Sequence, residues 1–237
     1  MKKLIPVLII FIFCSCIRNK PLTPAELRKK DSINTVNQKR ISDSITRRKE
    51  LSKVAFGDAK FGMSLKEVMK KDGFRGGTSF KGRGFFQGKD YAWAPYEKLT
   101  IGDDFYIKIE AHFFNDSLSL VTIESYFQTA NYIDNKLLDI SKNLKDVIAA
   151  KYGTPNSIYT HLPRIYDFSP NETIWMYEWV IEEKIIRIGM REEGSGSKYQ
   201  VYAEIFNKPM RERENKLETE KYNQQKKQQI KSDATKF

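Results

Sequence analysis

The stretch that decides the fold is FYIKIEAHFFNDSLSLVTIESYF, residues 105–127. Apolar and polar side chains alternate on both sides of its centre, and this period of two is typical of β-strands that bury one face. The centre, Asn115-Asp116-Ser117, consists of residues that favour turns. The stretch therefore predicts a β-hairpin with a three-residue loop.

The alternation also predicts the register of the two strands. A three-residue loop sets Ile109 beside Ile123 and so keeps apolar side chains on one face. It also sets Lys108 opposite Glu124, which pairs opposite charges on the other face. A slip of one residue would mix the two faces, which a half-buried sheet disfavours.

A helix and three further strands are expected after the hairpin. Gly153 and Pro155 end a run of apolar residues spaced three and four apart, as in a helix that buries one face: Leu137, Ile140, Leu144, Val147, Ile148 and Tyr152. The strands are predicted over residues 173–181, 184–191 and 199–206. In the first strand, alternation places three aromatic residues on one face and two aliphatic residues on the other: Trp175, Tyr177 and Trp179 against Met176 and Val180.

A second, short helix is expected before the hairpin. Ser64 and Glu67 have the spacing of a capping box, in which each side chain accepts a hydrogen bond from the backbone of the other. The element order is then helix, hairpin, helix and three strands. It predicts an α+β fold, an antiparallel sheet with helices packed on one face, flanked by charged tails that are helical or disordered.

The glycine-rich residues 73–88 form the candidate binding segment. Glycine allows close approach of the backbone, aromatic rings offer stacking faces, and arginine and lysine contact anions. The segment predicts either a binding loop or an irregular hairpin, and it lacks the Gly-Lys-Ser/Thr of a phosphate loop. The candidate binding residues of this region are Arg75, Phe80, Lys81, Arg83, Phe85 and Trp93.

Catalytic and metal-binding groups are scarce in the sequence. The chain has two histidines, His112 and His161, and two cysteines, both within the first 16 residues. His112 is expected on a strand face with Lys108 and Glu110, exposed or covered by a helix. No spacing of an EF-hand or a zinc protease occurs. We therefore expect no catalytic residues, no metal site and no cofactor.

The N-terminus has the features of an export signal. Lys2-Lys3 precedes an apolar run, residues 4–13, which is shorter than the about 20 residues that span a bilayer. Ser15-Cys16 resembles the lipobox of bacterial, Bacteroidetes-like lipoproteins, with Cys14 two residues upstream. The resemblance implies a signal peptide over residues 1–15, lipidation (palmitate) of Cys16 and membrane attachment through this lipid.

Two charged segments flank the folded part. Residues 16–53 are predicted to be a basic linker, partly helical, and residues 209–237 a charged tail without enough apolar residues to pack on a core. The globular domain is expected over residues 54–208. The formal net charge of +11 would suit nucleic acid in a cytosolic protein, but export leaves anionic lipids and wall polymers, or simple solubility.

Two short motifs resemble known envelope proteins. Residues 61–69, FGMSLKEVM, and 151–155, KYGTP, resemble the helix start and helix stop of outer-membrane assembly lipoproteins of the BamE type and of the β-lactamase-inhibitor-protein-like fold. The resemblance implies an envelope protein that binds other proteins without catalysis, and it carries over no functional residue.

The sequence therefore predicts a non-catalytic binding or scaffolding lipoprotein of the cell envelope. No acidic residue follows Cys16 closely, so we expect attachment to the outer membrane on its periplasmic face. An envelope protein is the expected partner, and nucleic acid is not. The alternative is an enzyme or carrier for cell-wall or glycan ligands that uses the glycine-rich residues 73–88.

Overall fold

The computed structural model describes residues 23–82, 89–95, 107–159, 162–194 and 197–234. The predicted signal peptide and Cys16 lie outside the described residues, as do Arg83 and Phe85. The chain divides into two units, residues 1–45 and 46–237, and each is described by itself. None of the helices in the described ranges is long and apolar enough to cross a membrane.

Helix α1 (Pro24–Lys53) fills most of the described part of the first unit and ends in the second. Up to residue 45, every side chain whose exposure is described is exposed, including Leu27, Ile33 and Val36. The thin apolar stripe of the predicted linker therefore packs on nothing within this unit. The helix is nevertheless continuous, where the sequence predicts a partly formed one.

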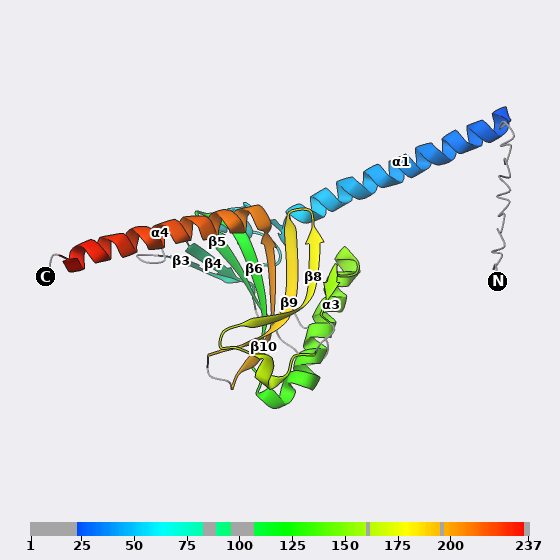
Figure 1. Ribbon diagram of the computed structural model, residues 1–237. Coiled ribbons are helices and arrows are strands. Elements are labelled where there is room, and N and C mark those ends of the chain that lie inside the picture. The colour runs from blue at the N-terminus through cyan, green and yellow to red at the C-terminus, as the bar shows by residue number, and fades with distance from the viewer. Residues whose placement is uncertain (1–22, 83–88, 96–106, 160–161, 195–196, 235–237) are drawn as a thin grey trace, which may run out of the picture. The chain divides into compact units, whose positions relative to one another are not determined.

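The second unit is built on an eight-stranded antiparallel sheet with the strand order β3-β4-β5-β6-β10-β9-β8-β7 (Figure 1). The order shows two halves, each a helix followed by four strands, joined where the last strands, β6 and β10, pair. The helices of the halves are α2 (Leu65–Val68) and α3 (Leu138–Tyr152). The strands are β3 (Thr78–Lys81), β4 (Lys89–Trp93), β5 (Ile107–Phe114), β6 (Ser117–Ser125), β7 (Ser157–Ile158), β8 (Thr173–Ile181), β9 (Lys184–Glu192) and β10 (Tyr199–Asn207).

Short elements complete the unit. Strands β1 (Val54–Phe56) and β2 (Ala59–Lys60) lie between α1 and α2 along the chain and form a small separate sheet. Two helical turns, η3 (Ala130–Tyr132) and η4 (Ile133–Leu137), lead into α3, and η5 (Ile165–Asp167) lies before β8. Helix α4 (Lys208–Ala234) follows β10 directly.

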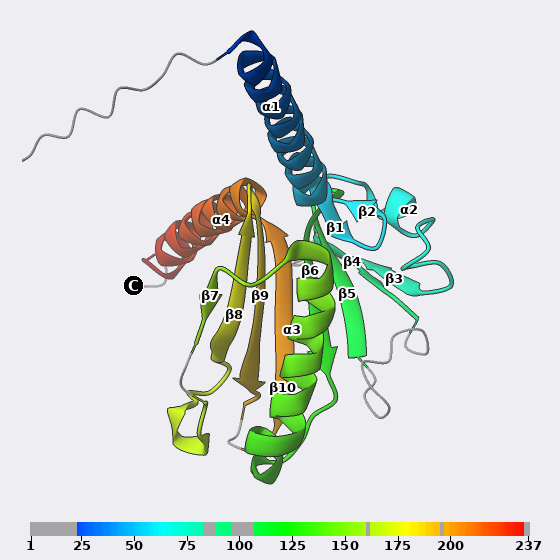
Figure 2. The same ribbon diagram turned by 90° about the vertical axis from the view of Figure 1, so that its right-hand side faces the viewer.

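The core lies between one face of the sheet and the helices α2 and α3. Leu144 of α3, Trp179 of β8 and Phe113 of β5 are buried in one continuous apolar cluster with Leu65 of α2. Figure 2 shows α3 lying lengthwise over this face of the sheet. The α+β fold and the packing of the two predicted helices on one face are confirmed. The buried face of α3 is narrower than predicted, because Val147, which was expected to lie on it, is 58 % exposed.

The capping box that begins α2 is confirmed. The Glu67 backbone N–H donates to the Ser64 hydroxyl, and the Ser64 backbone N–H donates to the Glu67 carboxylate at 2.8 Å. The helix is only one turn long, and turns continue the chain to Gly77.

The predicted register of β5 and β6 is also confirmed. Ile109 pairs with Ile123, and Lys108 pairs with Glu124. The loop is shorter than predicted, because Ser117 already pairs across the turn and only Asn115 and Asp116 connect the strands. An irregularity next to His112 absorbs one extra residue of β6 and so restores the expected pairing.

Strand β8 contains a similar irregularity, which corrects one prediction. Trp175 pairs with Gly189 and Tyr177 with Ile188, so Met176 is the extra residue. Trp175 therefore does not share a face with Tyr177 and Trp179: it lies on the side away from α3, while Met176 is buried in the core. Alternation counted along the sequence misses this because a bulge shifts the phase by one residue.

Helix α4 is the helical form of the charged tail predicted for residues 209–237, but its contacts with the sheet were not expected. Its first turns pack on the face of the sheet opposite α3, and their contacts include a buried hydrogen bond and an ion pair. Glu214 is buried there, and its carboxylate accepts hydrogen bonds from Ser119 at 3.2 Å and Arg211 at 3.0 Å. Lys89 of β4 pairs with Glu218 one turn further along α4. The composition of the tail could not reveal these contacts.

Candidate binding face

The sheet face opposite α3, here called the outer face, carries many polar and aromatic side chains, most of them half-exposed. Strand alternation brings every second residue of β3 to β6 and of β8 to β10 to this face. Members from both halves of the sheet are Phe80, Tyr91, Trp93, Lys108, Glu110, His112, Thr122, Glu124, Trp175, Glu178, Arg187, Arg191, Gln200, Tyr202 and Glu204. Most of them are aromatic or charged.

Three aromatic residues form a row at one side of the outer face. The ring of Tyr91 lies 6.5 Å from that of Phe80 and 6.4 Å from that of Trp93, and it also meets the His112 imidazole edge-on at 5.2 Å. The neighbouring strands β3, β4 and β5 supply these rings, because paired residues of adjacent strands share a face. Phe80, at the edge, is 48 % exposed.

Beside this row, the carboxylate of Glu110 contacts several polar and charged side chains. Glu110 accepts a hydrogen bond from the Trp93 indole N–H, and its carboxylate lies 2.9 Å from Lys108 Nζ and 3.5 Å from His112 Nε2. Burial lowers the pKa of the His112 imidazole to about 4, although Glu110 opposes this shift. His112 is therefore neutral at pH 7 and acts as a hydrogen-bonding partner of Thr122, at 3.2 Å.

Arginine and aromatic side chains alternate on the other half of the face. The guanidinium of Arg191 lies 3.5 Å from the ring centre of Tyr202, and that of Arg187 lies 5.7 Å from the ring centre of Trp175. Arg187 also donates to the Glu178 carboxylate at 2.6 Å. Stacking and ion pairing together hold the planar guanidinium groups in place.

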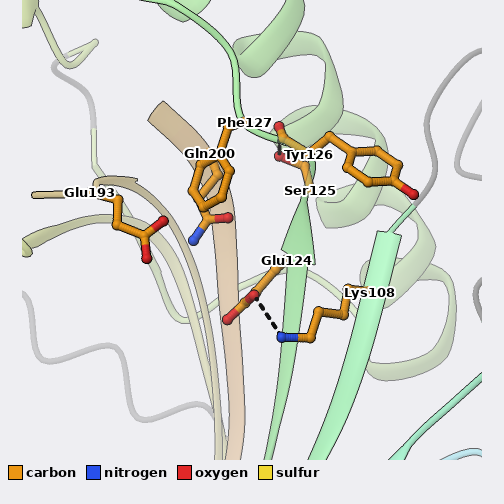
Figure 3. A pocket seen from close by; sticks show the side chains of 7 residues that line it. All are labelled: Lys108, Glu124, Ser125, Tyr126, Phe127, Glu193 and Gln200. Atoms are coloured by element: carbon orange, nitrogen blue, oxygen red, sulfur yellow. Dashed lines mark hydrogen bonds and ion pairs between the residues drawn. The ribbon is translucent and has the colours of Figure 1, made fainter. Parts of the chain in front are cut away.

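Between the two halves, the outer face is hollowed near the ends of β5, β6 and β10 (Figure 3). The hollow has a volume of about 320 Å³. Its lining combines two carboxylates, an amide, an ammonium group and two aromatic rings, and it consists of Lys108, Glu124, Ser125, Tyr126, Phe127, Glu193 and Gln200. Lys108 bridges Glu110 and Glu124 and so links the hollow to the charged groups described above.

Only part of the sequence-predicted site lies on the outer face. Phe80 and Trp93 lie there, whereas Lys81 points to the other side of β3. Arg75 lies in the turns after α2, where it is exposed and pairs with Asp72 at 3.0 Å. Residues 78–81 and 89–93 form a hairpin, one of the two structures expected for the glycine-rich segment. Arg83 and Phe85 lie outside the described residues.

Sequence reasoning missed the other members of the face, such as Arg187, Arg191 and Tyr202. Their alternation along β9 and β10 predicts that they share one face of the sheet. Nothing in the sequence distinguishes that face from one that is only exposed to solvent. His112 and Glu110 do share this face, as predicted. In the described part of the chain, no three His, Cys, Asp or Glu side chains gather closely enough to hold a metal ion.

Comparison with known proteins adds no relative. No protein-family model matches this sequence, and no curated protein or solved structure is significantly similar to it.

Proposed function

We propose that this chain is an outer-membrane lipoprotein on the periplasmic face of a bacterial envelope, and that it acts as a non-catalytic binding or scaffolding module through its outer face. One observation carries the binding role: the strands hold aromatic and arginine side chains, most of them half-exposed, on one face of the sheet. Aromatic residues and arginine are the types enriched in binding surfaces.

The geometry of the face supports binding in a second way. Arg187, Lys108 and Glu110 are already fixed by neighbouring side chains, with donor–acceptor distances of 2.6 and 2.9 Å. Side chains that are ordered before a partner arrives lose little conformational entropy when it binds.

The anchoring role rests on the sequence. The lipobox-like Ser15-Cys16 supplies the attachment point, and α1 lies between it and the sheet along the chain. At 1.5 Å per residue, a helix of 30 residues is roughly 45 Å long. Such a segment suits a protein that binds its partner at a distance from the membrane to which it is attached.

Site-specific photocrosslinking in cells tests the proposal. A photoreactive amino acid replaces Tyr91 or Trp175, which are half-buried on the outer face, and Tyr222 of α4, which is 63 % exposed, in a control. We expect discrete adducts from the outer-face positions that disappear when Arg191 is changed to Ala. Equal adducts from all three positions, or none from the outer face, would refute a binding role for this face.

A further inference from the structure

We propose that the hollow of Figure 3 binds a neutral saccharide, an inference that rests on the proposed binding role of the outer face and names a ligand for it. The inference depends on three properties of the hollow: an amide open to a ligand, charges of both signs and exposed aromatic rings. Each property restricts the chemistry of the ligand.

The first property is the side-chain amide of Gln200. Gln200 is 3 % exposed as a whole residue, but its side chain lines the hollow, where the amide stays open to a ligand. A polar group that lines a pocket is normally satisfied by water or by a ligand. The amide both donates and accepts, so a hydroxyl group is a suitable partner.

Two carboxylates face the same space as this amide. Glu124 and Glu193 line the hollow from β6 and from just beyond the end of β9, and Figure 3 shows both carboxylates pointing toward the space beside the Gln200 amide. Glu193 forms no ion pair with the described residues, and Glu124 lies 3.5 Å from Lys108. Each carboxylate therefore keeps lone pairs free to accept hydrogen bonds from a ligand.

The second property is the presence of both signs of charge. The lining holds the carboxylates of Glu124 and Glu193 and the ammonium group of Lys108, and Lys198, which is not part of the lining, lies 5.7 Å from the ring centre of Phe127. An anionic ligand would meet the two carboxylates, and a cationic ligand would meet the Lys108 ammonium group. A neutral ligand with several hydroxyl groups avoids both conflicts.

The third property is the pair of aromatic rings at the rim. Tyr126 is 58 % exposed and Phe127 is 43 % exposed. A sugar ring presents an apolar face of C–H groups as well as hydroxyl groups, so it can cover an aromatic ring while its edge bonds to the amide and carboxylates. The volume of about 320 Å³ lies at the lower end of the range of small-ligand pockets, about 300–1,000 Å³.

Binding to immobilised neutral oligosaccharides tests the inference. The full-length lipoprotein, in a detergent without sugar groups, is passed over N-acetylglucosamine oligomers and gluco-oligosaccharides, with oligolysine and a phosphorylated sugar as charged probes. We expect saturable binding to at least one neutral probe, with an affinity that changes little between about 0.05 and 0.5 M salt. Binding to the charged probes alone would overturn the inference.

Three variants locate the binding. Gln200→Met keeps the length and burial of the side chain but removes the amide, and Phe127→Ala removes an exposed ring; each should weaken binding about tenfold or more. Glu193→Gln, at an exposed position, keeps the test usable if Gln200→Met does not fold. Tyr166→Ala is the matched control, because Tyr166 is 72 % exposed and lies outside the hollow. Unchanged binding in the hollow variants would refute the site.

The two proposals can fail separately. Crosslinking from Tyr91 without saccharide binding would remove the saccharide and leave the binding role of the outer face. Saccharide binding that survives Gln200→Met and Phe127→Ala would place the ligand elsewhere on the protein.

Discussion

Lys184, the first residue of β9, donates a hydrogen bond from Nζ to the hydroxyl oxygen of Tyr152, the last residue of α3, at 2.7 Å. The same ammonium group lies 2.6 Å from the Val54 carbonyl oxygen and 3.4 Å from that of Leu51. One fully buried lysine thus joins the end of α1, the start of β1, α3 and the sheet. Burial lowers the pKa of Lys184 to about 7 and raises that of Tyr152 to about 12.

This burial predicts how stability depends on pH. Between pH 7 and the unfolded pKa of about 10.4, the unfolded chain binds more protons at Lys184 than the folded chain. The free energy of unfolding should therefore rise with pH through this group, by at most about 1.4 kcal/mol per pH unit, and below pH 7 the full cost of burial should remain. Lys184→Met should remove this rise.

Denaturant unfolding at pH 7, 8 and 9 checks this prediction. These values lie below the titration of Tyr152, whose raised pKa should lower stability above about pH 10. The difference in unfolding free energy between the original chain and Lys184→Met should change steadily over the three values. A constant difference would show that Lys184 is protonated in both states.

A second prediction concerns the two-residue turn between β5 and β6. Asn115 and Asp116 have φ angles of 49° and 58°, in the left-handed region, and Asp116 Oδ1 accepts a hydrogen bond from the Leu65 backbone N–H at 3.1 Å. Asp116→Ala loses this acceptor and strains the backbone, so it should destabilise the fold by about 1–3 kcal/mol. Asn115→Gly, which relieves strain without losing that bond, should be neutral or stabilising. Urea unfolding of the two variants should differ in these directions; equal effects would contradict the account.

A third prediction concerns the attachment of α4 to the sheet. Glu214 is 6 % exposed, and its carboxylate accepts hydrogen bonds from Ser119 and Arg211. Glu214→Ala should therefore lower the free energy of unfolding by about 1–3 kcal/mol. Glu220→Ala, on an exposed part of the same helix, should change stability by less than about 0.5 kcal/mol. Hydrogen exchange of α4 amides should rise in the first variant only. Similar exchange in both would mean that Glu214 does not hold the helix.

A fourth prediction concerns the proposed lipid anchor. Cys16→Ala should release a soluble, folded protein, since the buried core cluster consists of residues between Ala55 and Ile205. The basic residues near the N-terminus are expected to retain a fraction on anionic membranes, at about 1 kcal/mol per charge, and high salt should release that fraction. Fractionation of cells in high salt measures this.

The control for the anchor is Cys14→Ala. If it releases the protein while Cys16→Ala does not, the lipidation site is Cys14. If neither variant releases the protein in high salt, residues 4–13 act as an uncleaved anchor and the lipoprotein proposal is wrong.

Local patterns in the sequence were enough to predict most of the secondary structure. The capping box at Ser64, the helix stop at Gly153 and the pairing of Ile109 with Ile123 depend on neighbours in the chain, and the structure has all three. The bulge at Met176 was not predictable, because its residue type does not differ from that of an ordinary strand residue.

The candidate site was harder to predict, because its members come from distant strands. Gln200 and Glu124 share the hollow only through the pairing of β6 with β10, which no local pattern reports. The glycine-rich segment drew attention by its composition, yet only Phe80 of its described candidates reaches the outer face, joined there by Trp93. Composition reports the types of side chain available, and the topology of the sheet decides which of them meet.

The pairing of β6 with β10 also has a kinetic consequence. Within each half, every strand pairs with its neighbour along the chain, so these contacts close short loops and form early. The central pair, which sets Ile123 beside Ala203, must close a loop that contains α3 and three strands. We therefore expect the two halves to gain structure before they join, with the closing of this long loop as the slow step of folding.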